Sequence, residues 1–559
     1  MRKKMVALML GLAMVTSSLA ACANTQEQKE TEVASAVEET EKKTTDSTSQ
    51  PEEEVKSGEE IAVDAFAGTQ LTIAIGKNDA DMCEDFSEKP AVKMAEEATG
   101  IKVNWIPIDS ATKTEKVSTM LASDMPDMMI GLVDSNIIAK NMDLFYDLSE
   151  DGLLETYAPN VYADYQVING AMEAITWADG SIRSLMSNAA IDYNGQARGI
   201  MYINQSWLDQ LGLDMPASAE ELYEVLCAFR DNDMNGNGDT TDEIPYGFCQ
   251  NHYASMIYEF GSYFGIAGQS NGLLNFAKMV KDGKVVPTFD TDEMRTYLEY
   301  LHRMEEDGLI DVEGFSQTNE QWNAKLADGR VGIFSGWAPS TYMGSELAEQ
   351  YTLLTPFNAI EGVDFVQSGS YESLASWPDT VVISADTENV KAALHYYNYL
   401  ASSTEMKYTC SYGNQGETWD IDENGEIYTM AYEGELPSGW TSTNYSYTYA
   451  LLGGGLGPVL RSDESARKDF SVGKRPYYVQ QVLDYVSREY TPVRMTDPDK
   501  LSERAFMETE LETYLDQFVA TSVMDGITDA SWEAHLEQLK AVQYYDWIEW
   551  WQGFCDAEF

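Results

Sequence analysis

The stretch of this chain best suited to chemistry is residues 231–248, which read DNDMNGNGDTTDEIPYGF. Oxygen-bearing side chains occupy alternate positions through most of this stretch, and glycines separate them. An EF-hand-type loop also places oxygen ligands at alternate positions and needs glycine at the sixth position for a sharp turn. The stretch therefore predicts a site for a hard cation, with Ca²⁺ as a structural cofactor.

Two registers of this loop are open. The first counts from Asp233, and its ligands would be Asp233, Asn235, Asn237, the backbone carbonyl of Asp239, Thr241, Asp242 and Glu243. The second counts from Asp231 and places Gly236 sixth, Asp239 ninth and Asp242 twelfth. Neither register has the usual glutamate at its twelfth position, so we expect modest affinity. The alternative is a plain acidic loop in which Asn and Asp side chains make Asx turns after a helix.

Polar side chains also follow two predicted strands. Asn78 and Asp79 follow the run 70–76, and Asp134 follows the run that ends at Val133. Polar side chains at the carboxyl ends of parallel strands can bind ligand hydroxyls, so these three are candidate binding residues. The alternative is that they are solvated loop residues.

Strands and helices alternate along the first part of the chain. Short β-rich runs at 70–76, 101–108 and 126–133 predict strands, and helical spacing at 89–101 and 114–123 predicts helices between them. This alternation is typical of an α/β lobe with parallel strands. Farther along, we expect a strand and a helix in 197–213, helices at 218–230, 291–310, 388–403 and from 531 to 559, and strands at 328–337 and 378–385. Ser218 and Glu221 predict a capping box.

Length and charge restrict the class of protein. A chain of 559 residues is too long for one hydrophobic core, so we expect two lobes or more. The formal net charge of -57 excludes nucleic acid as a partner, because phosphate binding needs a basic surface. Five widely spaced cysteines remain after Cys22, and this odd number argues against a disulfide framework. Four histidines and no Cys-x-x-Cys argue against zinc.

The first residues predict export. Arg2, Lys3 and Lys4 precede a short apolar run, as in a secretory signal peptide over residues 1–21. The run ends in Leu-Ala-Ala-Cys, which resembles the lipobox of bacterial lipoproteins, so Cys22 is the expected lipidation site. Residues 22–65 contain no aromatic residue, and we expect them to form a disordered acidic tether. The alternative is an ordinary secretory signal cut after Ala21.

From about residue 66 onward the chain resembles the extracellular solute-binding proteins of ABC importers, in the family of maltose- and oligosaccharide-binding proteins. The order and spacing of five segments carry the resemblance: KPAVKMAEEATGIKVNWIPI, SDMPDMMIG, GIMYINQSWLDQLGLDMPASAEELYEVLCAF, DGRVGIFSGW and VVISADTENVKAALHYYNYLAS. It implies the type II periplasmic-binding-protein-like α/β fold, with two lobes, crossing hinge strands and a ligand cleft. It also implies capture of an oligosaccharide or another small solute by a monomer, delivery to ABC permease subunits, and a lipid anchor as the only membrane contact on a Gram-positive cell.

The resemblance also places the lobes and the site. It implies crossings near Gln196–Tyr202 and Ser368–Trp377, lobe 1 from 66–195 and 375–430, and lobe 2 from 196–374 and 431–559. Arg198, Tyr202, Tyr371 and Trp377 then become candidates at the crossings, and Trp337 after the SGW strand offers an aromatic platform for a sugar ring. The alternatives are core packing for Trp337 and an ordinary ion pair for Arg198. The resemblance favours the calcium register that starts at Asp233.

An enzyme and an adhesin are the competing classes. A glycoside hydrolase needs two positioned carboxylates, but 93 acidic residues supply pairs by chance and no motif singles one out. Four scattered histidines argue against a serine hydrolase, which needs a histidine positioned beside its nucleophile. The sequence therefore predicts a binding protein without catalysis, with a secreted hydrolase or a surface adhesin as the alternative.

Overall fold

A computed structural model describes most of the chain. It covers residues 61–557 apart from 168–170, 187, 191–196, 198, 253–254, 269–271, 370–379, 424, 426, 431, 433, 454–458, 462–474, 488, 490, 493–494 and 496. The signal peptide, Cys22 and nearly all of the predicted tether lie outside these residues, as do Arg198, Tyr371 and Trp377. Within the described part, no helix combines the length and apolarity that a membrane span requires.

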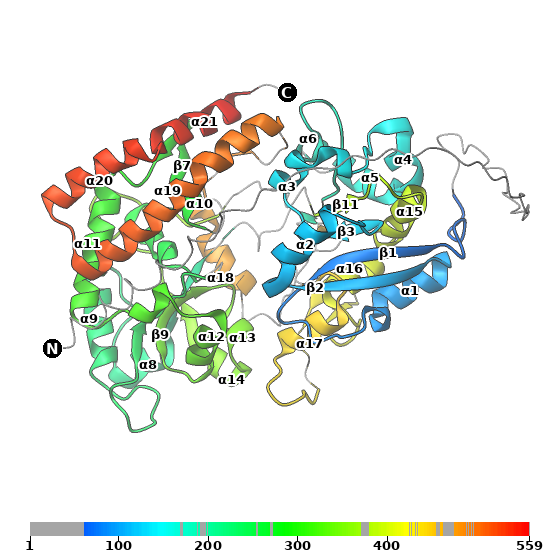
Figure 1. Cartoon of the computed structure of the whole chain (residues 1–559). Coiled ribbons are helices and arrows are strands. Elements are labelled where there is room, and N and C mark those ends of the chain that lie inside the picture. Colours follow the sequence, from blue (N-terminus) through cyan, green and yellow to red (C-terminus); the bar gives the residue numbers. More distant parts are fainter. Residues whose placement is uncertain are drawn as a thin grey trace, which may run out of the picture. The chain divides into compact units, whose positions relative to one another are not determined.

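The first sheet has the strand order β11-β3-β1-β2 (Figure 1). Its strands are β1 (Gln70–Lys77), β2 (Lys102–Asp109), β3 (Met128–Ile130) and β11 (Val381–Ile383). β1 is parallel to β2 and β3, and β11 is antiparallel to β3. Helices α1 (Pro90–Thr99) and α2 (Lys113–Leu121) connect the parallel strands, which confirms the alternation predicted from the sequence.

Both faces of the first sheet are buried. On β1, Leu71, Ile73 and Ile75 pack in a core that includes α1 and α15 (Val390–Leu400), whereas Ala74 packs in a second core with Val117 of α2. Successive side chains of a strand point to opposite faces, so a strand covered on both sides must be apolar throughout. This explains why the strand is apolar from Ile73 to Ile75, whereas the polar Gln70 and Thr72 at its start are less buried.

The second sheet has the order β10-β5-β9-β6. Its strands are β5 (Ile200–Asn204), β6 (Ile244–Tyr246), β9 (Val331–Gly336) and β10 (Tyr351–Leu353). β5 is antiparallel to β9 and β10, while β6 is parallel to β9, so this sheet is mixed. Its main core includes α8 (Gln205–Leu211), α9 (Ala219–Arg230) and α11 (Asp292–Glu306). Two sheets with separate cores form the two-lobe α/β architecture that the sequence predicted.

The start of α9 differs in one detail from the prediction. Ser218 accepts a hydrogen bond from the Glu221 amide at 3.2 Å, as an N-cap does. The Glu221 carboxylate, however, accepts from the Ala217 amide at 2.8 Å. The reciprocal bond of the predicted capping box is therefore shifted by one residue, because the chain entering the helix presents the Ala217 amide to this carboxylate.

Three long helices end the chain: α19 (Pro498–Asp525), α20 (Asp529–Ala541) and α21 (Tyr544–Asp556). They are drawn in orange and red in Figure 1. Leu511 and Leu515 of α19 pack in the core of the second sheet, whereas Leu501 near its start packs in a core of the first sheet. The helix predicted from residue 531 is two helices, because the chain bends at Gln543, which has a positive φ of 59°.

A buried lysine lies against this helical layer. Lys278 starts the hairpin of β7 (Lys278–Lys281) and β8 (Lys284–Pro287), and its Nζ lies 5.0 Å and 4.4 Å from the ring centres of Trp547 and Trp551. Burial lowers the pKa of Lys278 to about 7. The aromatic faces compensate part of the lost hydration and hold the hairpin against α21.

The described parts of the two predicted crossings lie side by side, because Ala197 forms an antiparallel bridge with Gly369. β11 lies in the first sheet. Leu451 and Leu452 also pack in a core of the first sheet, although the expected division gave residues from 431 onward to lobe 2. The remaining bounds of the lobes stay a prediction.

The other elements are short. The helices are α3 (Ser135–Lys140), α4 (Leu153–Tyr157), α5 (Pro159–Val167), α6 (Ala171–Ile175), α10 (Leu273–Phe276), α12 (Asn319–Ala327), α13 (Pro339–Tyr342), α14 (Ser345–Ala348), α16 (Thr404–Tyr412), α17 (Ser442–Tyr449) and α18 (Arg475–Val482). The strands are β4 (Asn188–Ala190), β12 (Trp419–Ile421), β13 (Ile427–Thr429) and β14 (Val459–Arg461). Cys83, Cys227, Cys249, Cys410 and Cys555 carry free thiols.

Candidate ligand-binding and calcium sites

Trp337 follows the last residue of β9 and is half-buried. The residue before it must be glycine, since a Cβ on Gly336 would lie 2.7 Å from the Tyr342 ring. This close approach lets the Tyr342 hydroxyl accept a hydrogen bond from the Trp337 amide at 3.0 Å. The SGW sequence therefore fixes the backbone from which the indole projects.

Arg475 of α18 holds the same tryptophan from a distant part of the chain. Its guanidinium carbon lies 3.7 Å from the centre of the Trp337 ring. Its Nη1 donates to the Trp337 carbonyl, and its Nη2 donates to the Ala197 carbonyl, each at 2.7 Å. Arg475 is 1% exposed, so this cation–π contact and both hydrogen bonds are shielded from water. Arg475 thereby joins the first predicted crossing to the end of β9.

Tyr202 does not take the predicted role of a ligand contact. It lies in β5, is fully buried and packs on Phe334 and Tyr478. Its hydroxyl donates to the Trp337 carbonyl at 2.8 Å, and burial raises its pKa. All five side chains of β5 are buried, so both faces of this strand are covered. Tyr202 therefore holds the backbone of Trp337 by this hydrogen bond and does not contact a ligand itself.

Buried polar side chains surround this end of the second sheet. The Ser255 hydroxyl donates to the Ser335 carbonyl at 2.7 Å, and the hydroxyls of Ser262 and Ser368 are 3.2 Å apart. His252 packs on the Tyr342 ring, and burial lowers its pKa to about 4, so its imidazole is neutral at neutral pH. The hydroxyl contacts place fixed dipoles beside the predicted crossings, which a site for hydroxyl-rich ligands requires.

The predicted ligand-binding residues of the first sheet lie at one edge of it. β1 and β3 are parallel neighbours, so Asn78, Asp79 and Asp134 follow strand ends at the same edge. All three are exposed. Asp79 accepts from the Ser110 hydroxyl at 2.7 Å, and Asn78 accepts from the Ala80 amide at 2.9 Å. The Asp134 carboxylate accepts from the Ile137 amide at 2.8 Å and caps α3, which is a structural role.

The predicted calcium loop folds as a chain of Asx turns. Asp233 accepts from the amides of Gly236 and Gly238, each at 2.8 Å. Asn235 accepts from the Asn237 amide at 3.0 Å, and Asn237 accepts from the Asp239 amide at 2.7 Å. These Asx turns are also the structure that a plain acidic loop predicts. Hydrogen bonds from Thr241 lower the pKa of Asp239.

The contacts of the flanking acids favour the register that starts at Asp233. Asp231, the first ligand of the other register, instead pairs with Arg230 at 2.7 Å and is exposed. Asp242 accepts from the Asn237 amide group at 3.0 Å, which brings the two ends of the loop together. Arg330 Nε holds this end, 3.0 Å from the Asp242 carbonyl.

One oxygen in this loop has no protein partner. Glu243 Oε1 accepts from the Met234 amide at 2.8 Å, whereas Glu243 Oε2 is buried without a hydrogen bond. A buried carboxylate oxygen without a donor is costly unless a cation satisfies it. Within the described residues no group of three or more His, Cys, Asp or Glu side chains converges as a metal site. The fit to Ca²⁺ therefore depends on amide and carbonyl oxygens beside the carboxylates, which Ca²⁺ accepts.

Comparison with known proteins identifies the family. Residues 90–416, more than half of the chain, match the family described as bacterial extracellular solute-binding protein. The chain belongs to this family. Both sheets contribute to the matched region, from α1 to the loop after α16. The resemblance seen in the sequence is thereby confirmed.

Two relatives named for the carbohydrates they bind match more than half of the chain. The chain is 24% identical over 489 residues to the fructooligosaccharide ABC transporter substrate-binding protein FusA of Streptococcus pneumoniae serotype 4, covering 85% of this chain and 88% of FusA. The polygalacturonan/rhamnogalacturonan-binding protein YtcQ of Bacillus subtilis is 23% identical over 60% of this chain and 64% of YtcQ.

Solved structures share the fold. FusA in complex with kestose has a TM-score of 0.74 at 20% identity, over 87% of this chain and 99% of that chain. An extracellular solute-binding protein from Bifidobacterium longum subsp. infantis has a TM-score of 0.72 at 24% identity, over 87% and 98%. The alginate-binding protein AlgQ2 without calcium ion has a TM-score of 0.70 at 20% identity, over 89% and 100%. These matches confirm the predicted fold class.

The sequence did not predict two arginines that contact the candidate sites from distant parts of the chain. Arg475 lies 138 positions from Trp337, and Arg330 lies 88 positions from Asp242. Neither arginine belongs to a motif. The only local signal for Arg475 is that it stands before Pro476, in a stretch for which the sequence predicted no element.

Proposed function

We propose that this protein captures an oligosaccharide and delivers it to the permease subunits of an ABC importer, as a monomer. The observation that carries the proposal is Trp337, whose indole projects from the end of β9 and is held by Arg475 and Tyr202. An aromatic ring fixed beside buried polar groups suits a sugar, which presents an apolar ring face and hydroxyls. Relatives named for binding fructooligosaccharide and polygalacturonan support this ligand class.

The proposed mechanism is a hinge equilibrium without chemistry. Ala197 and Gly369 are paired at the predicted crossings, and Arg475 ties Ala197 to Trp337. A ligand that contacts both walls of a cleft binds the closed form more tightly and shifts the population toward it. Asn78, Asp79 and Asp134 of the first sheet are proposed to supply hydrogen bonds from the opposite wall. Arg198, Tyr371 and Trp377 keep their proposed places at the crossings.

Calorimetry with a glycan panel tests the function. The panel contains kestose, alginate oligosaccharides and a mannose-rich N-glycan, which represent neutral, acidic and branched ligands. Trp337→Ala is expected to weaken binding of the best ligand by about ten-fold or more, because it removes a large apolar contact worth about 1–3 kcal/mol. Trp337→Phe keeps a ring and should lose less.

Two results would contradict this proposal. The first is equal affinity of wild type and Trp337→Ala for every glycan that binds. The second is cleavage of a glycan by the purified protein, with turnover abolished by changing one carboxylate. The second result would establish the hydrolase alternative, and binding only to intact cell surfaces would favour an adhesin.

We also propose that the loop from Asp233 to Glu243 holds a structural Ca²⁺. Asp233, Asn235, Asn237, the Asp239 carbonyl, Thr241, Asp242 and Glu243 would supply its oxygens. The bound ion would satisfy Glu243 Oε2 and hold the loop that follows α9. A solved relative is described as an EF-hand mutant of FusA, and another as AlgQ2 without calcium ion, which supports a calcium site in this fold.

Removal of calcium is expected to destabilise the protein. An ion bound only by the folded state adds about 2.7 kcal/mol when its free concentration is about 100 times Kd. Chelator should therefore lower Tm for wild type and have no effect on Asp233→Ala. Asp231→Ala is the matched control, because Asp231 pairs with Arg230 outside the favoured register. If Asp231→Ala rather than Asp233→Ala loses the response to chelator, the other register is correct.

We propose that a lipid on Cys22 anchors the protein at the extracellular face of the cell membrane. The Leu-Ala-Ala-Cys motif after the signal sequence motivates this, and a relative named lipoprotein LipO, 28% identical over 251 residues, supports it. A diacylglycerol with an added acyl chain gives stable attachment. Cys22→Ala should move the protein from the membrane fraction to the medium. A variant that stays in the membrane fraction would exclude this anchor.

A further inference from the structure

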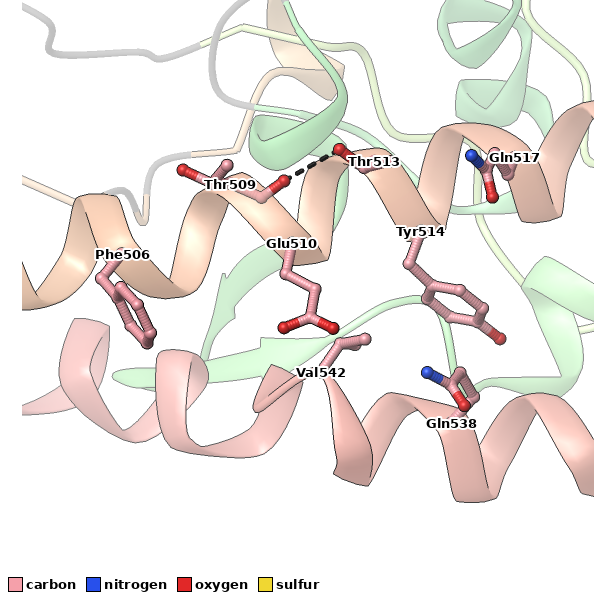
Figure 2. Close-up of a pocket in the computed structure, with 8 residues that line it drawn as sticks. All are labelled: Phe506, Thr509, Glu510, Thr513, Tyr514, Gln517, Gln538 and Val542. Atoms are coloured by element: carbon pink, nitrogen blue, oxygen red, sulfur yellow. Dashed lines mark hydrogen bonds between the residues drawn. The ribbon is translucent and has the colours of Figure 1, made fainter. Parts of the chain in front are cut away.

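A pocket of about 530 Å³ lies between α19 and the end of α20, and it shares no residue with the Trp337 site. Figure 2 shows Glu510 and Tyr514 pointing from α19 toward the facing helix, where Gln538 points back and Val542 forms part of the floor. Phe506 closes one end and is 76% exposed. An aromatic ring this exposed, beside a pocket, is a candidate contact for a ligand.

The two threonine hydroxyls of this pocket donate their protons to backbone carbonyls. Thr509 donates to the Ala505 carbonyl and Thr513 donates to the Thr509 carbonyl, each at 2.9 Å, within α19. A hydroxyl that donates in this way still has a lone pair for an incoming donor. Glu510 adds an exposed carboxylate, which accepts only.

The direction of the Tyr514 hydroxyl is fixed by His535. His535 Nε2 lies 2.8 Å from the Phe289 carbonyl, which can only accept, so Nε2 carries the ring proton. Burial lowers the pKa of His535 to about 4, so its Nδ1 is a bare acceptor at neutral pH. Tyr514 therefore donates to Nδ1 at 2.7 Å, and its oxygen remains an acceptor for a ligand.

The chemistry of the lining selects the class of ligand. The oxygens of Thr509, Thr513 and Tyr514 can accept hydrogen bonds, and the Glu510 carboxylate disfavours an anion. The side-chain amides of Gln517 and Gln538 can donate as well as accept. A saccharide matches this set, because each hydroxyl both donates and accepts and the ring face packs on an aromatic side chain.

We propose that the pocket between α19 and α20 is a second carbohydrate site that binds one neutral saccharide unit. Phe506 packs against the sugar ring, while Glu510, Tyr514 and the two glutamines bond its hydroxyls. A glycan chain held at two separate points on the protein, or on neighbouring copies, gains avidity without new contacts at the Trp337 site.

Saturation-transfer NMR on the full chain, with maltotriose and kestose as probes, tests this site. The experiments use Trp337→Ala as the background, so that binding at the first site is weakened by about ten-fold or more. Signals from at least one probe should persist in this background. Adding Phe506→Ala should weaken the apparent affinity about ten-fold, since the aromatic contact is lost. Glu503→Ala, an exposed change on the same helix outside the pocket, is the control and should have no effect.

The outcomes separate the two carbohydrate proposals. Loss of all signals in Trp337→Ala alone would overturn the second site and leave the first intact. An apparent affinity that Phe506→Ala leaves unchanged would also overturn it. If Phe506→Ala keeps its saccharide signals but no longer associates with membranes that contain the permease, the pocket is a protein-docking surface and the proposal is wrong.

Discussion

Lys89→Met is expected to lower the free energy of unfolding by about 3–5 kcal/mol, since it leaves one partner of a buried ion pair without the other. Lys89 Nζ lies 2.9 Å from Asp81 Oδ2, and both side chains are almost fully buried. The same ammonium accepts no bonds and donates to the carbonyls of Tyr447, Thr448 and Ala450 at 3.2, 2.9 and 2.7 Å. Methionine fills a similar volume but satisfies none of these oxygens.

The Lys89 contacts also show which elements would lose stability in the Lys89→Met variant. The three carbonyls lie at the end of α17, where the helix dipole favours a cation. Burial raises the pKa of Asp81 and lowers the pKa of Lys89, and each charge opposes the shift of the other. Removing the ammonium would therefore detach α17 from the start of α1 as well as leave Asp81 uncompensated.

Urea unfolding followed by tryptophan fluorescence checks this prediction. Lys93→Met is the matched control, because the Lys93–Glu88 pair has a similar distance of 2.7 Å but is 56% and 68% exposed. Exposed pairs contribute about 0–1 kcal/mol, so this control should unfold close to wild type. Equal unfolding midpoints for Lys89→Met and Lys93→Met would show that the buried network adds no stability.

Arg475→Met is expected to lower both stability and glycan affinity. It leaves the carbonyls of Trp337 and Ala197 without their arginine donors, at a cost of about 1–3 kcal/mol for a buried acceptor. It also removes the cation from the face of the Trp337 ring, so the indole is no longer fixed and must be ordered by the ligand. Binding of the best glycan should weaken by at least about ten-fold.

Calorimetry and thermal unfolding on the same samples separate these effects. Arg475→Lys keeps the charge but cannot place two N–H groups on two carbonyls, so it should recover stability only in part. Arg303→Met is a matched control, because Arg303 also stacks on a ring, at 3.6 Å from the centre of Tyr223, but pairs with the exposed Glu220. Unchanged glycan affinity in Arg475→Met would show that Trp337 is held without this residue or that the ligand binds elsewhere.

The local patterns of the sequence predicted much of the fold. The run at 70–76 and the glycine at 100 predicted β1 and the end of α1, because strand formation and a left-handed turn depend on adjacent residues. The loop from Asp233 was also readable, since Asx turns join residues two to five positions apart. The helix at the end of the chain was predicted in position but not in its bend at Gln543.

The sequence by itself determined the export signal motif, the alternating elements, the family and the oxygen-rich loop, because each is encoded by neighbouring residues or by their order. Only the tertiary structure decided that Tyr202 is buried under Trp337, that Arg475 covers the indole and that Lys89 closes α17. These contacts join residues 135, 138 and 361 positions apart. No local period or motif encodes such pairs, because they form only when separate elements pack and leave a polar group that water can no longer reach.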